Sequence, residues 1–138
     1  MATRSRIGYI NKDGKIVSAY CHFDGYPHHN GKLLLENYTN LEKVQTLVDG
    51  GDMSYLAKNC GKPEGHSFEH PVKDHVVYYG RDRGELNVKT IVLDNISQLF
   101  EVANNSWVEF IYLFDNGDWK YSDMSNMEFK NLTKEICK

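Results

Sequence analysis

The sequence SRIGYINKDGKIVSAYCHF at residues 5–23 places two runs rich in Ile, Val and Tyr on either side of Lys12-Asp13-Gly14-Lys15. Asp-Gly between two such runs is a strong signal for a two-residue turn, so residues 5–23 are predicted to form a β-hairpin. The register of that turn would pair Ile10 with Val17, Gly8 with Ala19, Arg6 with Cys21 and Ser5 with His22. This hairpin is the first part of the predicted sheet.

A second hairpin is predicted at residues 107–123, where Asn116-Gly117 is the strongest short turn signal in the chain. Its register pairs Phe114 with Trp119 and Tyr112 with Tyr121. Such aromatic pairs most often pack within a sheet, and the alternative is a stacking platform for nucleic-acid bases.

Four segments have the spacing of amphipathic helices. Capping signals bound three of them: Thr39 with Glu42 as a capping box, Asp94 as an N-cap, and Ser125 with Glu128 as a second capping box. Gly50-Gly51 is predicted to end the second helix. The apolar stripes are Leu33, Leu34 and Tyr38; Leu41, Val44, Leu47 and Val48; Ile96, Leu99, Phe100 and Ala103; and Phe129, Leu132 and Ile136.

Residues 54–71 contain two glycines and two prolines with little periodicity, which predicts a long irregular surface connection. Residues 76–79 are predicted to form a buried strand. The elements together indicate one α+β domain over residues 1–138, with a mainly antiparallel sheet built from the N- and C-terminal hairpins and short helices packed against it.

The composition is that of an ordinary globular protein, with 41% hydrophobic and 25% charged residues in a chain of 138. A net charge of −3 disfavours general nucleic-acid binding. The chain has no signal-peptide pattern and no apolar run long enough for a membrane span, so we expect a cytoplasmic protein. Cys21, Cys60 and Cys137 are an odd, scattered set, which favours reduced thiols over disulfides.

The first of two polar signatures is Cys21-His22-Phe23-Asp24-Gly25-Tyr26-Pro27, directly after the first hairpin. If the strand continues, His22 and Asp24 point to the same side, where the carboxylate could orient the imidazole or both could contact a ligand. The alternative is a turn in which Asp24 bonds backbone N–H groups, Tyr26 packs and His22 is a satisfied polar residue. Arg4 and Arg6 are expected near this signature.

The second signature is Tyr78-Tyr79-Gly80-Arg81-Asp82-Arg83-Gly84-Glu85. The guanidinium groups of Arg81 and Arg83 suit carboxylate or phosphate ligands. The alternative is an internal ion-pair network with Asp82 and Glu85 that closes the end of a strand. The two interpretations are compatible, because acidic neighbours can position arginines for an anionic ligand.

Metal and nucleophile patterns are incomplete. Cys60, His66, His70 and His75 have poor spacing for zinc, so we expect no metal and no cofactor. Cys21 adjoins His22, but neighbours on a strand point to opposite faces, so Cys21 is predicted to be a packed thiol.

The N-terminal Thr-Arg-Ser-Arg-Ile-Gly, both signatures and the Tyr-Leu-Phe-Asp-x-Gly-x-Trp hairpin together resemble a family of small uncharacterised proteins of bacteriophages and prophages. The chain departs from that family at Phe23, where Trp is commoner. The resemblance covers most of the chain. It implies an accessory protein that acts inside the infected cell, in host takeover or against host defences, by binding a host protein or by removing a signalling molecule.

Three functional hypotheses follow. The first is an accessory protein that binds a host protein or an anionic nucleotide-like ligand in the host cytoplasm. The second is a phosphoester-type hydrolase with His22 and Asp24 as the catalytic pair and Arg81 and Arg83 stabilising negative charge. The third is a structural or oligomerising domain, and a homodimer is compatible with all three. The candidate ligand-binding residues are Arg4, Arg6, His22, Asp24, Tyr26, Arg81, Asp82, Arg83 and Glu85.

Overall fold

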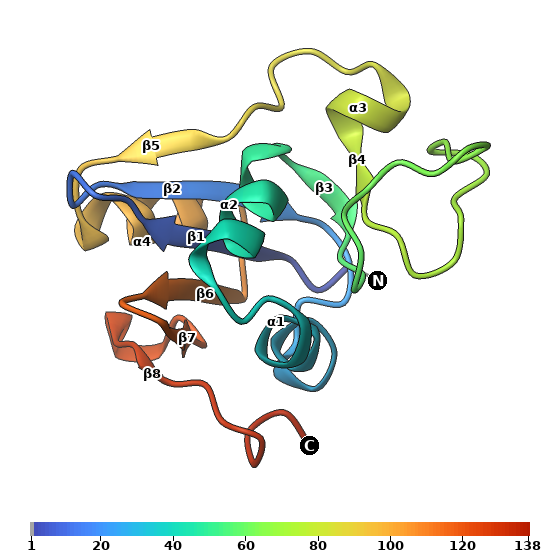
Figure 1. Cartoon of the computed structure of the whole chain (residues 1–138). Coiled ribbons are helices and arrows are strands. Elements are labelled where there is room, and N and C mark those ends of the chain that lie inside the picture. Colours follow the sequence, from blue (N-terminus) through green and yellow to red (C-terminus); the bar gives the residue numbers. More distant parts are fainter. Residues whose placement is uncertain (1) are drawn as a thin grey trace.

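The computed structural model describes residues 2–138 and shows an α+β fold built on one eight-stranded sheet (Figure 1). The strand order is β4-β3-β2-β1-β6-β7-β8, and β5 pairs with β2. The strands are β1 Ser5–Ile10, β2 Ile16–Cys21, β3 Met53–Tyr55, β4 Val77–Tyr78, β5 Ile91–Leu93, β6 Phe110–Asp115, β7 Asp118–Ser122 and β8 Lys130–Asn131. The β1–β6 and β2–β3 pairings are parallel and the others are antiparallel, which confirms the predicted mainly antiparallel sheet.

Helices cover both faces of the sheet. They are a π-helical turn at Pro27–Gly31, α1 Lys32–Asn37, α2 Leu41–Asp49, α3 Tyr79–Arg83 and α4 Ile96–Asn105, with a 3-10 turn at Ser125–Met127. Figure 1 shows α1 and α2 in front of the sheet and α4 behind it. Val44 and Leu47 of α2 belong to the core on the front face, and Leu99 and Phe100 of α4 belong to the core on the back face.

The first hairpin forms, but its predicted register is wrong by one residue. The loop contains three residues, because Asn11 N–H donates to the Lys15 carbonyl at 2.8 Å and Gly14 adopts a left-handed conformation at φ +77°. The Asn11 side chain stabilises this loop by accepting from two backbone N–H groups. Ile10 therefore pairs with Ile16, and the remaining corrected pairs include Arg6 with Tyr20, Gly8 with Ser18 and Ser5 with Cys21.

The second hairpin has the predicted register, with Phe114 opposite Trp119 and Tyr112 opposite Tyr121. All four side chains belong to the front-face core or pack against it. Tyr112 donates to the Gly25 carbonyl and Trp119 Nε1 donates to the Tyr38 carbonyl at 2.8 Å. These rings are therefore packing elements of the core.

The helix caps differ from the predicted ones by one residue each. Asn40, rather than Thr39, caps α2 by accepting from Lys43 N–H, and Asn95, rather than Asp94, caps α4 by accepting from Gln98 N–H. Asp94 instead pairs with Lys15 on the surface, at 2.7 Å. The predicted end of α2 at Gly50-Gly51 is confirmed.

The predicted terminal helix is wrong. Met124, Asn126 and Met127 all have positive φ, which an α-helix of ordinary residues does not allow. The segment instead adds β8 to the edge of β7, and Leu132 N–H donates to the Trp119 carbonyl at 3.0 Å. Leu132 is buried all the same, so the apolar residue reaches the core without a helix.

The long connection is only partly as predicted. Residues 53–55 form β3, and the irregular part runs over residues 56–76. It is not wholly a surface loop, because Leu56, Ala57 and His66 are buried. The strand expected at residues 76–79 is shorter, since α3 begins at Tyr79.

Candidate functional site

In the corrected register, polar side chains of β1 and β2 lie on the back face of the sheet, which α4 covers only in part. Side chains alternate along a strand, so Arg6 lies on the same face as Ile10, and Tyr20 lies beside it on β2. The last β1–β2 pair is Ser5 with Cys21, and one more pair in the same register places Arg4 opposite His22. We call Arg4, Arg6, Tyr20 and His22 the basic patch.

Arg6 is the most buried member of the basic patch, with 5% of its surface exposed. Its Nε donates to the Ser18 hydroxyl at 2.7 Å and its Nη2 to the Ser18 carbonyl at 3.2 Å. Burial lowers the pKa of Arg6 and the charge of Asp52 opposes that shift. The Nη1 atom of Arg6 forms no hydrogen bond within residues 2–138. Because every fully buried polar side-chain atom in these residues has a hydrogen-bond partner, Nη1 must be in contact with solvent.

Neither arginine of the basic patch forms an ion pair. Within residues 2–138, no carboxylate lies within 4.0 Å of the guanidinium groups of Arg4 or Arg6. The carboxylate of Asp52 faces the same region, where it accepts from Tyr20 N–H at 3.0 Å, and burial raises its pKa. The basic patch therefore contains two cations, Arg4 and Arg6, and the neighbouring Asp52 carboxylate lies more than 4.0 Å from both guanidinium groups.

His22 is held by Tyr20, whose hydroxyl lies 2.8 Å from its Nδ1. Partial burial and the charge of Arg4 lower the pKa of His22, so the ring is uncharged at neutral pH. The Tyr20 hydroxyl and His22 Nδ1 share one hydrogen bond, and the ring tautomer decides which of the two donates. No partner of Nε2 occurs within residues 2–138, so this ring nitrogen is available for a hydrogen bond beside Arg4.

Asp24 is not the partner of His22. It has a φ of +58°, and its carboxylate accepts the Tyr26 hydroxyl at 3.0 Å. Tyr26 in turn stacks on His28, with ring centroids 4.2 Å apart. Within residues 2–138 no His22–Asp24 ion pair occurs within 4.0 Å, so the carboxylate that a hydrolase would use to orient His22 is engaged elsewhere.

The turn of the first signature anchors the start of β1. Gly25 N–H donates to the Thr3 carbonyl at 2.8 Å, and a Cβ at this position would stand 2.7 Å from that same oxygen. Below the turn, buried Asn30 donates to Ser5 Oγ at 3.3 Å. This part of the signature fits a structural role.

Arg81 and Asp82 of the second signature form a buried ion pair that supports the long connection. The Asp82 side chain is fully buried and accepts from Arg81 Nε at 2.8 Å and from Tyr78 N–H at 2.9 Å. Arg81 also donates to the carbonyls of Cys60 and Val76, at 2.7 and 3.1 Å. Most of the Arg81 donors are therefore used within the protein.

His66 completes the Asp82 cluster. Its Nδ1 accepts from Val72 N–H at 2.9 Å, so the proton of the neutral ring is on Nε2, which donates to Asp82 at 3.2 Å. The cluster ties residues 60, 66, 72 and 76 to α3. The ion-pair interpretation of the second signature fits Arg81 and Asp82.

Arg83 and Glu85 lie at the exposed end of α3. The Arg83 guanidinium covers the Phe68 ring at 4.7 Å, and its Nε is 3.7 Å from the Glu85 carboxylate. Phe68 packs beside Tyr79 at 5.7 Å. The backbone of Tyr79 lies beside the basic patch, because Tyr79 N–H donates to the carbonyl of Asp52, whose carboxylate accepts from Tyr20 N–H.

The chain segments that carry the two signatures approach each other at Asp52, which was not predicted as a site residue and accepts from both Tyr20 N–H and Tyr79 N–H. Arg4, Arg6 and His22 lie in one patch, Asp24 and Tyr26 lie in the neighbouring turn, and Arg83 and Glu85 lie at the exposed end of α3 beside Phe68. Alternation along β2 could have indicated Tyr20 from His22. No sequence pattern points to Phe68, because it lies in the irregular connection.

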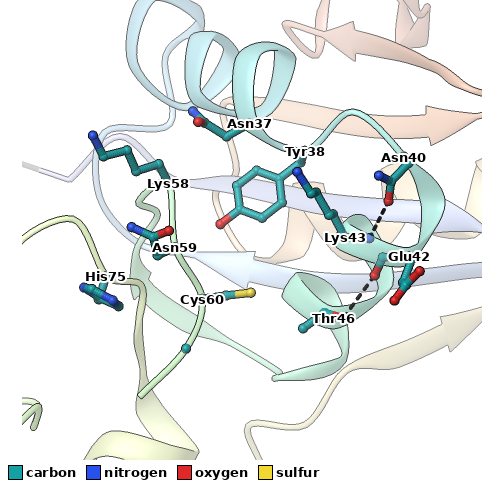
Figure 2. A pocket seen from close by; sticks show the side chains of 11 residues that line it. Asn37, Tyr38, Asn40, Glu42, Lys43, Thr46, Lys58, Asn59, Cys60 and His75 are labelled. Carbon is teal, nitrogen blue, oxygen red and sulfur yellow. Dashed lines mark hydrogen bonds between the residues drawn. The ribbon is translucent and has the colours of Figure 1, made fainter. Parts of the chain in front are cut away.

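A separate polar cleft of about 570 Å³ lies between the start of α2 and residues 58–61 (Figure 2). None of the predicted site residues lines it. Figure 2 shows the Tyr38 ring and the Cys60 thiol in the space between these segments. Asn40 and Thr46 use their side chains to bond the backbone of α2, and burial raises the pKa of Cys60, so the cleft lacks an activated nucleophile.

The cysteines and histidines have ordinary structural surroundings. Cys21, Cys60 and Cys137 are free thiols, and burial raises the pKa of Cys21 to about 12, as expected for a packed thiol. His75 uses Nδ1 to bond the Lys73 carbonyl at 2.8 Å. Over residues 2–138, no three His, Cys, Asp or Glu side chains are grouped as metal ligands.

No protein-family model, no curated protein and no solved structure matches the chain. Among the described residues, none of the helices combines the length and the apolar character that a membrane crossing requires.

Proposed function

We propose that this chain binds a small anionic, nucleotide-like ligand at the basic patch. The observation that carries the proposal is the pair of arginines without an ion-pair partner in residues 2–138, one of them almost completely buried. Buried arginines are ordinarily paired, because an uncompensated charge in a protein interior is costly. Asp52 balances this charge only from beyond ion-pair distance, and a phosphate group bound at Arg4 and Arg6 supplies negative charge in direct contact with them.

The donors of the patch suit phosphate chemistry. The half-buried Arg4 presents a guanidinium group, Arg6 keeps Nη1 accessible, and His22 adds a ring nitrogen, Nε2. Guanidinium groups bind phosphate through paired N–H donors, which gives both affinity and orientation. Arg81 contrasts with them, since its donors are bonded to Asp82 and to two backbone carbonyls.

In this proposal the protein acts by binding, as an accessory protein of the phage type within the host cytoplasm. Binding is favoured over hydrolysis because Asp24, the proposed partner of His22, is bonded to Tyr26. Recovery of a cleaved ligand after incubation would instead support the hydrolase. If no anion binds, the hypothesis that the chain binds a host protein is the one to test next.

The proposal is tested by calorimetric titration of the protein with AMP, ADP and inorganic phosphate, supported by thermal unfolding. A ligand at about 100 times its Kd stabilises a protein by about 2.7 kcal/mol, which is a readily measured rise in Tm. Arg4→Gln is expected to weaken AMP binding at least ten-fold. Lys12→Gln removes the same charge from the exposed hairpin loop and is expected to leave binding unchanged.

Absence of binding by all three anions at millimolar concentration contradicts the proposal. Equal loss of binding in the Arg4 and Lys12 variants contradicts it as well, because it would show an effect of overall charge alone. Circular dichroism of each variant establishes that the fold is retained.

A further inference from the structure

Two pairs of aromatic side chains lie between the basic patch and the second signature. The His22 and Tyr20 rings are 5.9 Å apart, and the Tyr79 and Phe68 rings are 5.7 Å apart. The two pairs lie on either side of Asp52, whose carboxylate accepts from Tyr20 N–H at 3.0 Å and whose carbonyl accepts from Tyr79 N–H at 3.1 Å. We call Tyr20, Tyr79 and Phe68 the aromatic row.

Each end of the aromatic row has a cation. Arg4 and Arg6 lie at the Tyr20 end, and Arg83 covers Phe68 at the other end, 4.7 Å from its ring. The side chain of Arg83 is 54% exposed, and its only ion-pair neighbour in residues 2–138 is Glu85, at 3.7 Å. Glu85 is the acidic group that a ligand phosphate would face at this end.

The parts of the row are held in place by backbone contacts. Phe68 N–H donates to the Asp82 carbonyl at 3.2 Å, and Glu85 N–H donates to the Tyr79 carbonyl at 3.1 Å. The buried Arg81–Asp82 pair lies beneath this segment. An aromatic surface whose supporting backbone is bonded in this way loses little conformational entropy when a ligand binds.

We propose that the surface takes a ligand with phosphoryl groups on both sides of one nucleoside, for which a dinucleotide is the simplest chemistry. One phosphoryl group binds at Arg4 and Arg6, the second binds at Arg83, and a base stacks on the aromatic row. Aromatic side chains bind bases of any sequence because every base has a π-face. This inference rests on the proposed function and specifies its ligand class.

The test is a calorimetric comparison of AMP, ADP and the linear dinucleotide pApA. ADP and pApA carry similar negative charge, but only pApA places phosphates on both sides of a nucleoside. We expect pApA to bind at least ten-fold more tightly than ADP. Arg83→Gln and Phe68→Leu are expected to reduce the pApA affinity to that of AMP and to leave AMP binding unchanged, whereas Arg4→Gln weakens all three.

Lys73→Gln is the matched control, because it removes an exposed charge from the same long connection outside the aromatic row. Equal affinity for pApA and ADP, or unchanged pApA affinity in the Arg83 variant, overturns the inference. If AMP and ADP still bind and depend on Arg4, the proposed function stands while the dinucleotide inference fails; if none of the three binds, both fail. An affinity that keeps rising for single strands longer than pApA also overturns it, in favour of a nucleic-acid surface.

Discussion

Replacing Asp82 by Asn should destabilise the protein strongly, although the two side chains have nearly the same size. The carboxylate is fully buried and accepts from Arg81, Tyr78 N–H and His66 at 2.8–3.2 Å. Asn removes the charge and replaces one acceptor oxygen by an NH2 donor, which then faces another donor. Breaking a buried ion pair costs about 3–5 kcal/mol, and the partial exposure of Arg81 favours the lower figure.

We therefore expect Asp82→Asn to lower the free energy of unfolding by about 3 kcal/mol at pH 7. For a chain of this size that loss corresponds to a Tm lower by about 10 °C. Urea unfolding followed by circular dichroism measures it. Asp94→Asn is the matched control, because it breaks the exposed Lys15–Asp94 pair and should change stability far less.

A double-mutant cycle with Arg81→Met checks the assignment of this energy to the ion pair. The coupling between positions 81 and 82 is expected to exceed about 1 kcal/mol, as for residues that share one buried network. A loss below about 1 kcal/mol in Asp82→Asn, or a coupling near zero, would refute the structural role given to this cluster.

Three further predictions concern stability. Gly25→Ala should cost about 1–3 kcal/mol in urea unfolding, because the added Cβ would stand 2.7 Å from the Thr3 carbonyl oxygen. Asn40→Ala should cost about 1 kcal/mol through loss of the α2 cap, whereas Thr39→Ala should be nearly neutral; the reverse order would show that the cap is misassigned. Burial alone would raise the pKa of Asp82, but hydrogen bonds from Arg81 and Tyr78 and the charge of Arg81 hold that pKa below its ordinary value. The ionised Asp82 therefore stabilises the folded state fully above about pH 4, and this stabilisation is lost as the pH falls through the lowered pKa. Unfolding free energies from pH 7 to pH 3 should fall more steeply for the wild type than for Asp82→Asn.

Much of the sheet could be predicted because both hairpins have turn signals and apolar alternation. The error in the first hairpin comes from Asn11, whose side chain accepts from Asp13 N–H and Lys15 N–H and so stabilises a longer loop. These two hydrogen bonds require the conformation of the longer loop, which the Asp-Gly pair alone does not predict. The caps at Asn40 and Asn95 were missed for a related reason, since each stands next to another good capping residue.

The terminal segment shows where tertiary contacts outweigh local pattern. Residues 125–136 have helical spacing, but the edge of β7 offers backbone hydrogen bonds to Lys130 and Asn131. Leu132 then reaches the core beside Trp119. A sequence pattern does not show which sheet edge is open.

The candidate site was only partly predictable. The arginines and His22 stand out in the sequence, but their common face depends on the register, which was wrong by one residue. The separation of His22 from Asp24 follows from the positive φ of Asp24, which turns the chain before the carboxylate can return to the strand face. Phe68 is positioned by its N–H bond to the Asp82 carbonyl, a contact between distant residues that no local pattern contains.

The parallel pairing of β1 with β6 has a consequence for how the protein acquires its structure. β1 lies in the middle of the sheet, yet its partner on one side is roughly a hundred residues further along the chain. During synthesis this edge of the first hairpin therefore stays unpaired until β6 has left the ribosome. Contacts of such long sequence separation slow folding. Exchange of β6 between two copies would satisfy the same edge, so refolding at high concentration should favour intertwined dimers over monomers.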